Sequence, residues 1–213
     1  MGAQLWANVH DLAFLTALGG SLRRMAIGYA LVVALGITGG ILLGRFRVLD
    51  ELIGSLAVAL HAIPGAAWVP LAVLWFGMTE RAVIFTILLG ATGIVVVQTD
   101  TGIRQVPPLI VHAARTMGAK GLKFFWYVVI PAAVPKMVDG LRLAWAFGWR
   151  ALMAGELLTS VHGLGRLLSD VGKSGRIDQL VAMMIVVAAV GIVADEAVFK
   201  RLEASVHRRW GIA

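Results

Sequence analysis

Few side chains in this 213-residue sequence have the types and spacing that carry out catalysis or bind metal. The sequence has no cysteine, which excludes disulfides, thiolate ligands and cysteine nucleophiles. Its five histidines are scattered, without metal-ligand spacing, and no Ser–His–Asp or paired-carboxylate arrangement stands out. Gly172-Lys173-Ser174 resembles the end of a phosphate-binding loop, but Leu167 replaces the required upstream glycine. We therefore expect no enzyme, and no metal, cofactor or ATP bound by this chain.

The most distinctive polar stretch lies between residues 107 and 123. It reads Pro107-Pro-Leu-Ile-Val-His112-Ala113-Ala114-Arg115-Thr116-Met117-Gly118-Ala-Lys120-Gly-Leu-Lys123. The prolines favour a helix start and Gly118 a helix end, so His112 to Met117 is expected to form a short helix with a small apolar face. Such a helix with basic flanks could dock into a groove on a cytoplasmic partner. An interfacial helix on anionic lipid explains the pattern equally well.

Composition predicts that transmembrane helices position this stretch. Hydrophobic residues make up 59% and charged residues 15% of the sequence, and the mean hydropathy is +0.86. That charge is too little to cover a soluble surface. Because a spanning helix needs about 20 apolar residues, we divide the single domain 1–213 into spans at about 25–44, 52–79, 82–99, 131–155 and 179–199, with a loop at 100–130. Residues 1–22 are expected to form an interfacial or peripheral helix, since they lack the basic start of a signal peptide.

The 19 basic residues punctuate the apolar runs, which is typical of topology signals rather than of a nucleic-acid-binding face. Ten of them lie on the side of the long loop and the C-terminus, and six lie on the other side, Arg23 and Arg24 included. The excess predicts a cytoplasmic loop and C-terminus and an external N-terminus.

Rows of small residues indicate close helix packing. Gly28, Gly36, Gly40 and Gly44 share one face of the first span, and Gly140, Ala144 and Gly148 repeat the arrangement in the fourth. Small residues let helix backbones approach each other in lipid. Packing within one subunit and a subunit interface both explain these rows.

Pro64, Gly65 and Pro70 interrupt the second span near its middle. Each proline frees a backbone carbonyl that lipid cannot satisfy. The interruption is either a kink that serves packing or a broken helix that lines a translocation pathway. The candidate pathway residues here are His61, Pro64, Trp68, Trp75 and Met78; for His61 a packing role is the alternative.

The fourth span carries charges, which are costly in lipid. We expect Arg142 to pair with Asp139, and Arg150 either to pair with Glu156, to snorkel outward or, beside Trp149, to attract an anionic substrate. Asp195 and Glu196 are expected to be interfacial charges at the inner end of the last span.

The 112–131 stretch resembles the cytoplasmic signature loop of bacterial ABC importer permeases. That pattern is Glu-Ala-Ala, three residues, Gly, nine residues, Ile, one residue, Leu-Pro. Here Ala113, Ala114 and Gly118 match, Val128-Val-Ile130-Pro131 follows, and His112 replaces the usual glutamate. Similarity to the nitrate, sulfonate, taurine and bicarbonate branch extends over residues 20–210: Ser21-Leu-Arg23, Pro64, Ala67-Trp68-Val69-Pro70-Leu71, Trp75-Phe76-Gly77, Gly140-Leu141-Arg142, Glu156, Gly163-Leu164-Gly165 and Arg209-Trp210. That branch usually has a further N-terminal span, which is absent from these residues.

The resemblance implies an all-α polytopic membrane protein of the bacterial inner membrane, with five transmembrane helices and a coupling helix, the core of a type I ABC importer permease. It implies as partners a second permease copy, two cytoplasmic ATP-binding subunits that bind ATP and Mg, and an extracytoplasmic substrate-binding protein. The residues that couple to the ATPase would be His112, Ala113, Ala114, Arg115, Met117 and Gly118, and His112 could make coupling pH-sensitive. The solute would be small and anionic. A self-sufficient channel or secondary carrier is the alternative, and a membrane-embedded enzyme is disfavoured because no polar groups converge.

Overall fold

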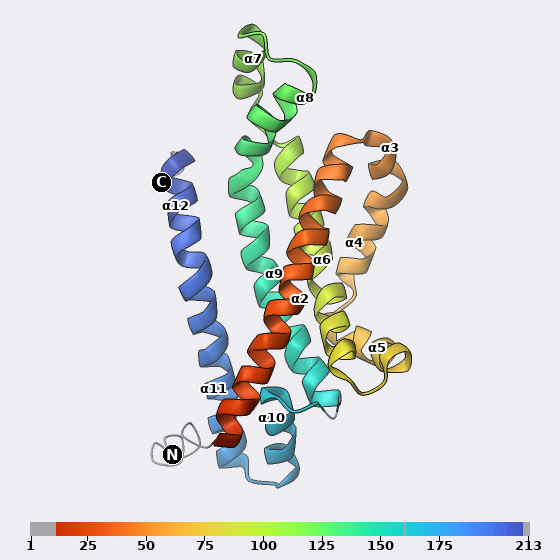
Figure 1. Cartoon of the computed structure of the whole chain (residues 1–213), viewed down its shortest axis with the longest axis vertical. Helices are drawn as coiled ribbons and strands as arrows, with labels where there is room; N and C mark the ends of the chain where they lie inside the picture. Colours follow the sequence, from red (N-terminus) through yellow and green to blue (C-terminus); the bar gives the residue numbers. More distant parts are fainter. Residues whose placement is uncertain (1–11, 160, 211–213) are drawn as a thin grey trace.

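The computed structural model describes residues 12–159 and 161–210, and within them the chain forms helices and short connections without any strand (Figure 1). The α-helices are α2 (Leu12–Arg45), α3 (Arg47–Leu49), α4 (Ser55–Ala62), α5 (Val69–Phe76), α6 (Glu80–Arg104), α7 (Pro108–Thr116), α8 (Gly121–Phe124), α9 (Ile130–Leu158), α10 (Leu164–Lys173), α11 (Ile177–Asp195) and α12 (Arg201–Trp210). Three π-helical turns, η1 (Asp50–Gly54), η3 (Phe125–Val129) and η4 (Glu196–Lys200), and one 3-10 turn, η2 (Gly65–Trp68), connect some of them.

Four helical stretches of the described residues are long and apolar enough to cross a membrane: Leu12–Arg45, Glu80–Arg104, Gly121–Leu158 and Ile177–Val206. They run up and down between two ends of an elongated bundle (Figure 1). One end carries α3, α7 and α8, and the other carries α5, α10 and the start of α2. The predicted first, third, fourth and fifth spans each lie within one of these stretches, with ends that extend beyond the predicted ones.

The helix predicted at residues 1–22 is not a separate element in its described part, because residues 12–22 are the first turns of α2. Residues 1–11 lie outside the described part of the chain. The paired arginines at 23 and 24 suggested a boundary between two segments. The helix continues through them because the Arg24 side chain is buried among carboxylates from other helices.

The predicted second span is broken, as the prolines indicated. Ile63 and Pro64 adopt extended backbone angles between α4 and η2. The cause is Pro64, which disfavours a helical conformation at the preceding residue and has no N–H to donate. Pro70 does not add a second break. It lies in the first turn of α5, where a missing N–H has no helical partner to lose.

The glycine row of α2 packs against α6 within the same chain. A Cβ on Gly36 would lie 2.5 Å from Val95 Cβ, and one on Gly40 would lie 2.4 Å from Thr99 Cβ. In α9, a Cβ on Gly140 would lie 2.5 Å from Gln98 Cβ. Packing within one subunit is therefore the correct interpretation of the first row. Gly140 of the second row likewise packs against α6 of the same chain.

At the α3 end, Arg104 joins three segments. Its guanidinium forms ion pairs with Asp100 at 2.7 Å and with Asp50 of η1 at 2.9 Å, and it donates a hydrogen bond of 3.1 Å to the Leu43 carbonyl of α2. A charged side chain thus links α6 to α2 and η1 at this end of the bundle.

Candidate functional site

The predicted coupling residues lie on α7 and the turn after it, at the tip of the molecule (Figure 1). The helix starts at Pro108, four residues earlier than predicted, since Pro107 is extended and Pro108 occupies the first turn. On its inner side, Val111 packs against the core cluster at this end of the bundle, and the Arg115 guanidinium carbon lies 5.8 Å from the ring centroid of Phe124. These two contacts hold α7 on the bundle.

The outward side of α7 is apolar and uncovered. Leu109 is 79% exposed and Met117 is 87% exposed, while His112 and Ala113 are exposed between them. Ala114 is half-buried. The sequence prediction included Met117 but missed Leu109, whose exposure only becomes visible once Val111 is known to face inward.

Gly118 ends α7 by backbone conformation. Its φ is +87°, a region that glycine adopts without strain. In this conformation its N–H donates to the Arg115 carbonyl at 3.0 Å, and the N–H of Ala119 donates to the Ala114 carbonyl at 3.0 Å. These bonds satisfy two carbonyls at the helix end. The glycine therefore sets the direction in which the chain leaves α7.

Of the predicted pathway residues, Pro64 is exposed and lies at the break beside Gly65. A Cβ on Gly65 would lie 3.1 Å from Ala151 Cβ and 3.6 Å from Gly90 Cα, which is near the middle of α6. The broken backbone therefore lies about halfway along the bundle. Lipid does not tolerate irregular backbone at that depth unless protein or water covers it.

The other predicted residues of this segment are spread along it. The indole N–H of Trp68 is buried and has no hydrogen-bond partner among the described residues. Trp75 is 61% exposed and stacks edge-on against Phe85 at 5.5 Å between ring centroids, and Met78 is exposed near it. The His61 side chain lies outside the described part of the structure.

Trp149 and Arg150 on α9 have different surroundings. Trp149 is buried, and its Nε1 lies 2.8 Å from where a Cβ on Gly191 would be, so it packs against α11. Arg150 is exposed, and its guanidinium carbon lies 5.4 Å from the ring centroid of Phe147. No carboxylate of the described residues forms an ion pair with Arg150. Arg150 is next in the chain to Ala151, which faces Gly65. Arg150 therefore lies at the level of the helix break.

Both residues line a cavity of about 870 Å³ between α9, α11 and α12. The far wall of this cavity holds Arg142, which forms ion pairs with Asp195 at 2.9 Å and with Glu203 at 2.5 Å. These partners differ from the predicted local partner Asp139. Asp195, predicted to be an interfacial charge, is paired with Arg142, and the helical stretch continues past it.

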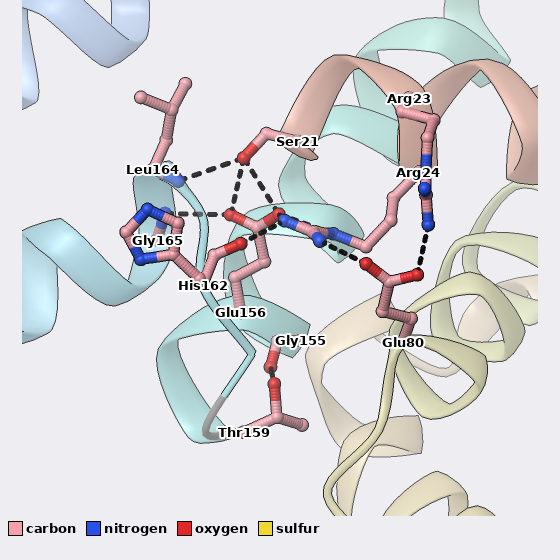
Figure 2. Close-up of polar contacts among 10 residues, drawn as sticks. All are labelled: Ser21, Arg23, Arg24, Glu80, Gly155, Glu156, Thr159, His162, Leu164 and Gly165. Atoms are coloured by element: carbon pink, nitrogen blue, oxygen red, sulfur yellow. Dashed lines mark hydrogen bonds and ion pairs between the residues drawn. The ribbon is translucent and has the colours of Figure 1, made fainter. Parts of the chain in front are cut away.

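The predicted pair of Arg150 with Glu156 is wrong because Glu156 has other partners. Its carboxylate is completely buried and accepts hydrogen bonds from Arg24 Nη2 at 2.7 Å and Arg24 Nε at 3.0 Å (Figure 2). Ser21 Oγ lies 2.8 Å from both carboxylate oxygens, and the backbone N–H of Gly165 donates to one of them at 2.9 Å. These contacts connect α2, α9 and the start of α10.

The same group of residues reaches a fourth segment through Glu80 at the start of α6 (Figure 2). Arg24 Nη1 lies 3.0 Å from one oxygen of Glu80, and Arg23 contacts the other oxygen. Arg24 Nη2 also donates to the His162 carbonyl at 2.7 Å, and Ser21 Oγ accepts from the Leu164 N–H at 2.9 Å. The sequence prediction missed this cluster, although the resemblance had singled out Ser21, Glu156 and the 163–165 segment separately.

Comparison with known proteins identifies the chain. Residues 36–208 match the family described as "Binding-protein-dependent transport system inner membrane component". The chain is 38% identical over 176 residues to MJ0413 of Methanocaldococcus jannaschii, covering 82% of this chain and 66% of that protein. It is 33% identical over 179 residues to the bicarbonate transport system permease protein CmpB of Synechococcus elongatus, covering 84% and 64%. With the taurine transport system permease protein TauC of Escherichia coli it shares 28% identity over 195 residues, covering 92% and 68%.

Solved structures show the same fold. A chain of the MetNI methionine ABC transporter superposes with a TM-score of 0.76 at 16% identity, covering 91% of this chain and 96% of that one. A chain of an amino acid ABC transporter superposes with a TM-score of 0.72 at 19% identity, covering 92% and 94%. The present chain spans about two thirds of the length of the sequence relatives it matches. It belongs to the binding-protein-dependent transport system inner membrane components, the permease family of ABC importers.

Proposed function

We propose that this chain is the transmembrane permease subunit of an ABC importer that couples to a cytoplasmic ATPase through α7. The observation that carries the proposal is the uncovered apolar side of α7 at the tip of the bundle, where Leu109 and Met117 are almost fully exposed. Trp126 and Tyr127 in η3 are also exposed, and such aromatic residues favour the membrane–water boundary. With these residues at the boundary, α7 lies beyond the lipid, in water.

Exposed apolar side chains in water favour a protein partner. An ATPase groove that receives His112, Ala113 and Met117 would cover them, and Ala114 and Arg115 would hold the helix at the correct angle from below. The positive φ of Gly118 supports this arrangement, since it fixes the turn after the docked helix. Closure of two ATPase subunits on ATP would then move α7 and the helices attached to it.

The proposed topology has five membrane crossings. The four long helical stretches supply four of them, and the broken segment α4–η2–α5 supplies the fifth. With α7 in the cytoplasm of a bacterial cell, the C-terminal end of α12 lies on the cytoplasmic side and the start of α2 on the outside of the inner membrane (Figure 1). Basic residues exposed on the outside would argue against this orientation, since they favour the cytoplasmic side. Arg24 is buried and therefore does not count as such an exposed charge.

The translocation pathway is proposed to run between two copies of the permease, along the exposed break at Pro64. A second copy would cover the irregular backbone that lipid does not tolerate. Arg150 lies at the same level without an ionic partner among the described residues, and a charge at this depth usually faces a cavity or a partner. A small anion passing this level would be attracted by it.

An anionic solute also fits the printed names of the relatives, which include bicarbonate, nitrate and taurine transport proteins. A separate extracytoplasmic protein would bind the solute and deliver it to the end of the bundle that carries α10. Trp75 and Met78, exposed near that end, are proposed to border the entrance. Trp68 and Trp149 would support the pathway by packing rather than by touching the solute.

The test uses the permease reconstituted in liposomes with the ATPase and binding protein encoded by its neighbouring genes. Met117→Asp should abolish ATP-driven uptake because it would place a carboxylate in an apolar groove, and Ala114→Asp should do so because it would displace α7 from its seat on the bundle. Both variants should still insert into the membrane. Met117→Leu is the matched control and should keep most of the uptake. If Met117→Asp and Ala114→Asp both transport normally, the coupling role of α7 is wrong. Flux driven by an ion gradient through the permease alone would favour a channel or secondary carrier instead.

A further inference from the structure

The cluster around Glu156 forms a closed set of polar contacts, which we call the outer clasp: the side chains of Ser21, Arg24, Glu80 and Glu156 and the backbone of residues 162–165 (Figure 2). Both oxygens of the Glu156 carboxylate are occupied, one by Arg24 and Ser21 and the other by Ser21 and the Gly165 N–H. The Arg24 side chain is 2% exposed and the Glu156 side chain is fully buried.

The clasp joins four segments that lie far apart in the sequence. Arg24 and Ser21 come from α2, Glu80 from α6, Glu156 from α9, and residues 162–165 from the end of the α9–α10 connection and the first residues of α10. Charges balance within it when Arg23 is included, because two arginines face two glutamates. The charges of the clasp are therefore balanced without a further ion or ligand.

Separating any of these segments would be strongly unfavourable. Moving α2 away from α9 would separate the buried charges of Arg24 and Glu156 and leave the Glu156 carboxylate without its cationic partner. The glycines of the connection also leave no room for sliding. A Cβ on Gly163 would lie 2.5 Å from both Arg24 Nη2 and the Glu156 carboxylate, and one on Gly165 would lie 2.7 Å from Glu156 Cβ.

Of these segments, α2 and α6 are also held together along their length and at the other end. The glycine row of α2 packs tightly against α6, and Arg104 ties α6 to α2 and η1. By contrast, α4–η2–α5 is interrupted at Pro64, and α11 has exposed apolar side chains over much of its surface. Conformational change is easier where fewer buried polar contacts have to be broken.

We propose that the outer clasp stays closed throughout the transport cycle, so that α2, α6, α9 and the 162–165 connection move as one rigid body. This inference rests on the proposed function, because it concerns how the permease moves when ATP is used. Opening of the pathway toward the outside then takes place at the broken segment α4–η2–α5 and not between α2 and α10. The clasp thus keeps these segments in one arrangement relative to each other while the permease changes conformation.

Because the sequence has no cysteine, a thiol reagent would react within this chain only at introduced cysteines, which allows a cross-linking test. Thr16 on α2 and His162 in the connection are suitable positions, because their side chains lie 3.4 Å apart and outside the contacts of the clasp side chains. The variant Thr16→Cys/His162→Cys would be bridged with a short bifunctional thiol reagent in the assembled, reconstituted transporter. Each single-cysteine variant treated with the same reagent is the matched control.

The bridged transporter should keep ATP-driven uptake within about two-fold of the unbridged double variant, as expected when two parts of one rigid body are linked. Loss of uptake on bridging, restored when the bridge is cleaved, would overturn the inference. Failure of the proposed function would look different, since the unbridged variant would then show no ATP-driven uptake at all.

A second measurement tests the clasp even in that case. Hydrogen–deuterium exchange of the peptide that contains the Leu164 and Gly165 amides should be as slow as that of the middle of α6, with and without ATP, in the purified permease with its ATPase. Rapid exchange of these amides in either state would show that the clasp opens and would refute the inference.

Discussion

Glu156 near the end of α9 is paired with Arg24 in α2, 132 residues earlier in the chain, and water reaches neither side chain. The pair lies where α2, α6, α9 and the start of α10 meet (Figure 2). A buried carboxylate of this kind is stable only with its full set of donors.

Removing one charge of this pair should destabilise the protein more than removing both. Glu156→Gln leaves Arg24 with Glu80 alone and should cost about 3–5 kcal/mol. The double variant Arg24→Met/Glu156→Gln has balanced charge again and keeps an acceptor for the Gly165 N–H, so it should recover part of that loss. Thermal unfolding in detergent measures both. Additive losses in the double variant would show that the two residues do not interact.

Gly118→Ala should weaken coupling through the backbone. An alanine at φ +87° is strained by about 1 kcal/mol, so the turn after α7 should shift. ATP-driven uptake should fall while the amount of permease in the membrane stays the same. Gly19→Ala is the matched control, because Gly19 is helical and a Cβ there meets nothing within 4 Å. Equal uptake in the two variants would exclude a special role for the Gly118 conformation.

Gly36→Ala should destabilise the contact between α2 and α6. The new methyl group would lie 2.5 Å from Val95 Cβ and 2.7 Å from Val95 Cγ1, and overpacking of this kind costs about 1–3 kcal/mol. Val95→Ala in the same chain should restore much of the stability by making room. The double variant is compared with each single variant by thermal unfolding. If Gly36→Ala alone has no effect, the close approach of the two helices is not as described.

Arg150→Ala should raise the substrate concentration needed for half-maximal uptake, if Arg150 attracts an anion in the pathway. Arg150→Lys keeps the charge and should change this concentration less. Arg142 is the matched comparison in the same cavity: Arg142→Ala removes the ion pairs with Asp195 and Glu203 and should loosen α12, which limited proteolysis would detect. An unchanged half-maximal concentration in Arg150→Ala would indicate that Arg150 has a structural role only.

The sequence determined the class of the protein and the positions of the long helices, because these depend on local properties. Apolar runs of sufficient length predicted spans that lie within α2, α6, α9 and α11, and prolines at 64 and 107 predicted the broken segment and the start of α7. The loop pattern around Ala113, Ala114 and Gly118 indicated the family before any contact was known. Each of these signals is carried by neighbouring residues and needs no knowledge of what packs against them.

Only the tertiary structure decided which charges meet. The sequence offered Asp139 and Glu156 as nearby partners of Arg142 and Arg150, since periodicity shows only which residues of one helix share a face. In the folded chain Arg142 reaches Asp195 and Glu203, and Glu156 faces Arg24. Arg24 itself counted as an outer loop charge until the fold buried it between two glutamates from distant helices. Such pairings depend on how the helices are rotated and shifted against one another, and no single helix encodes that.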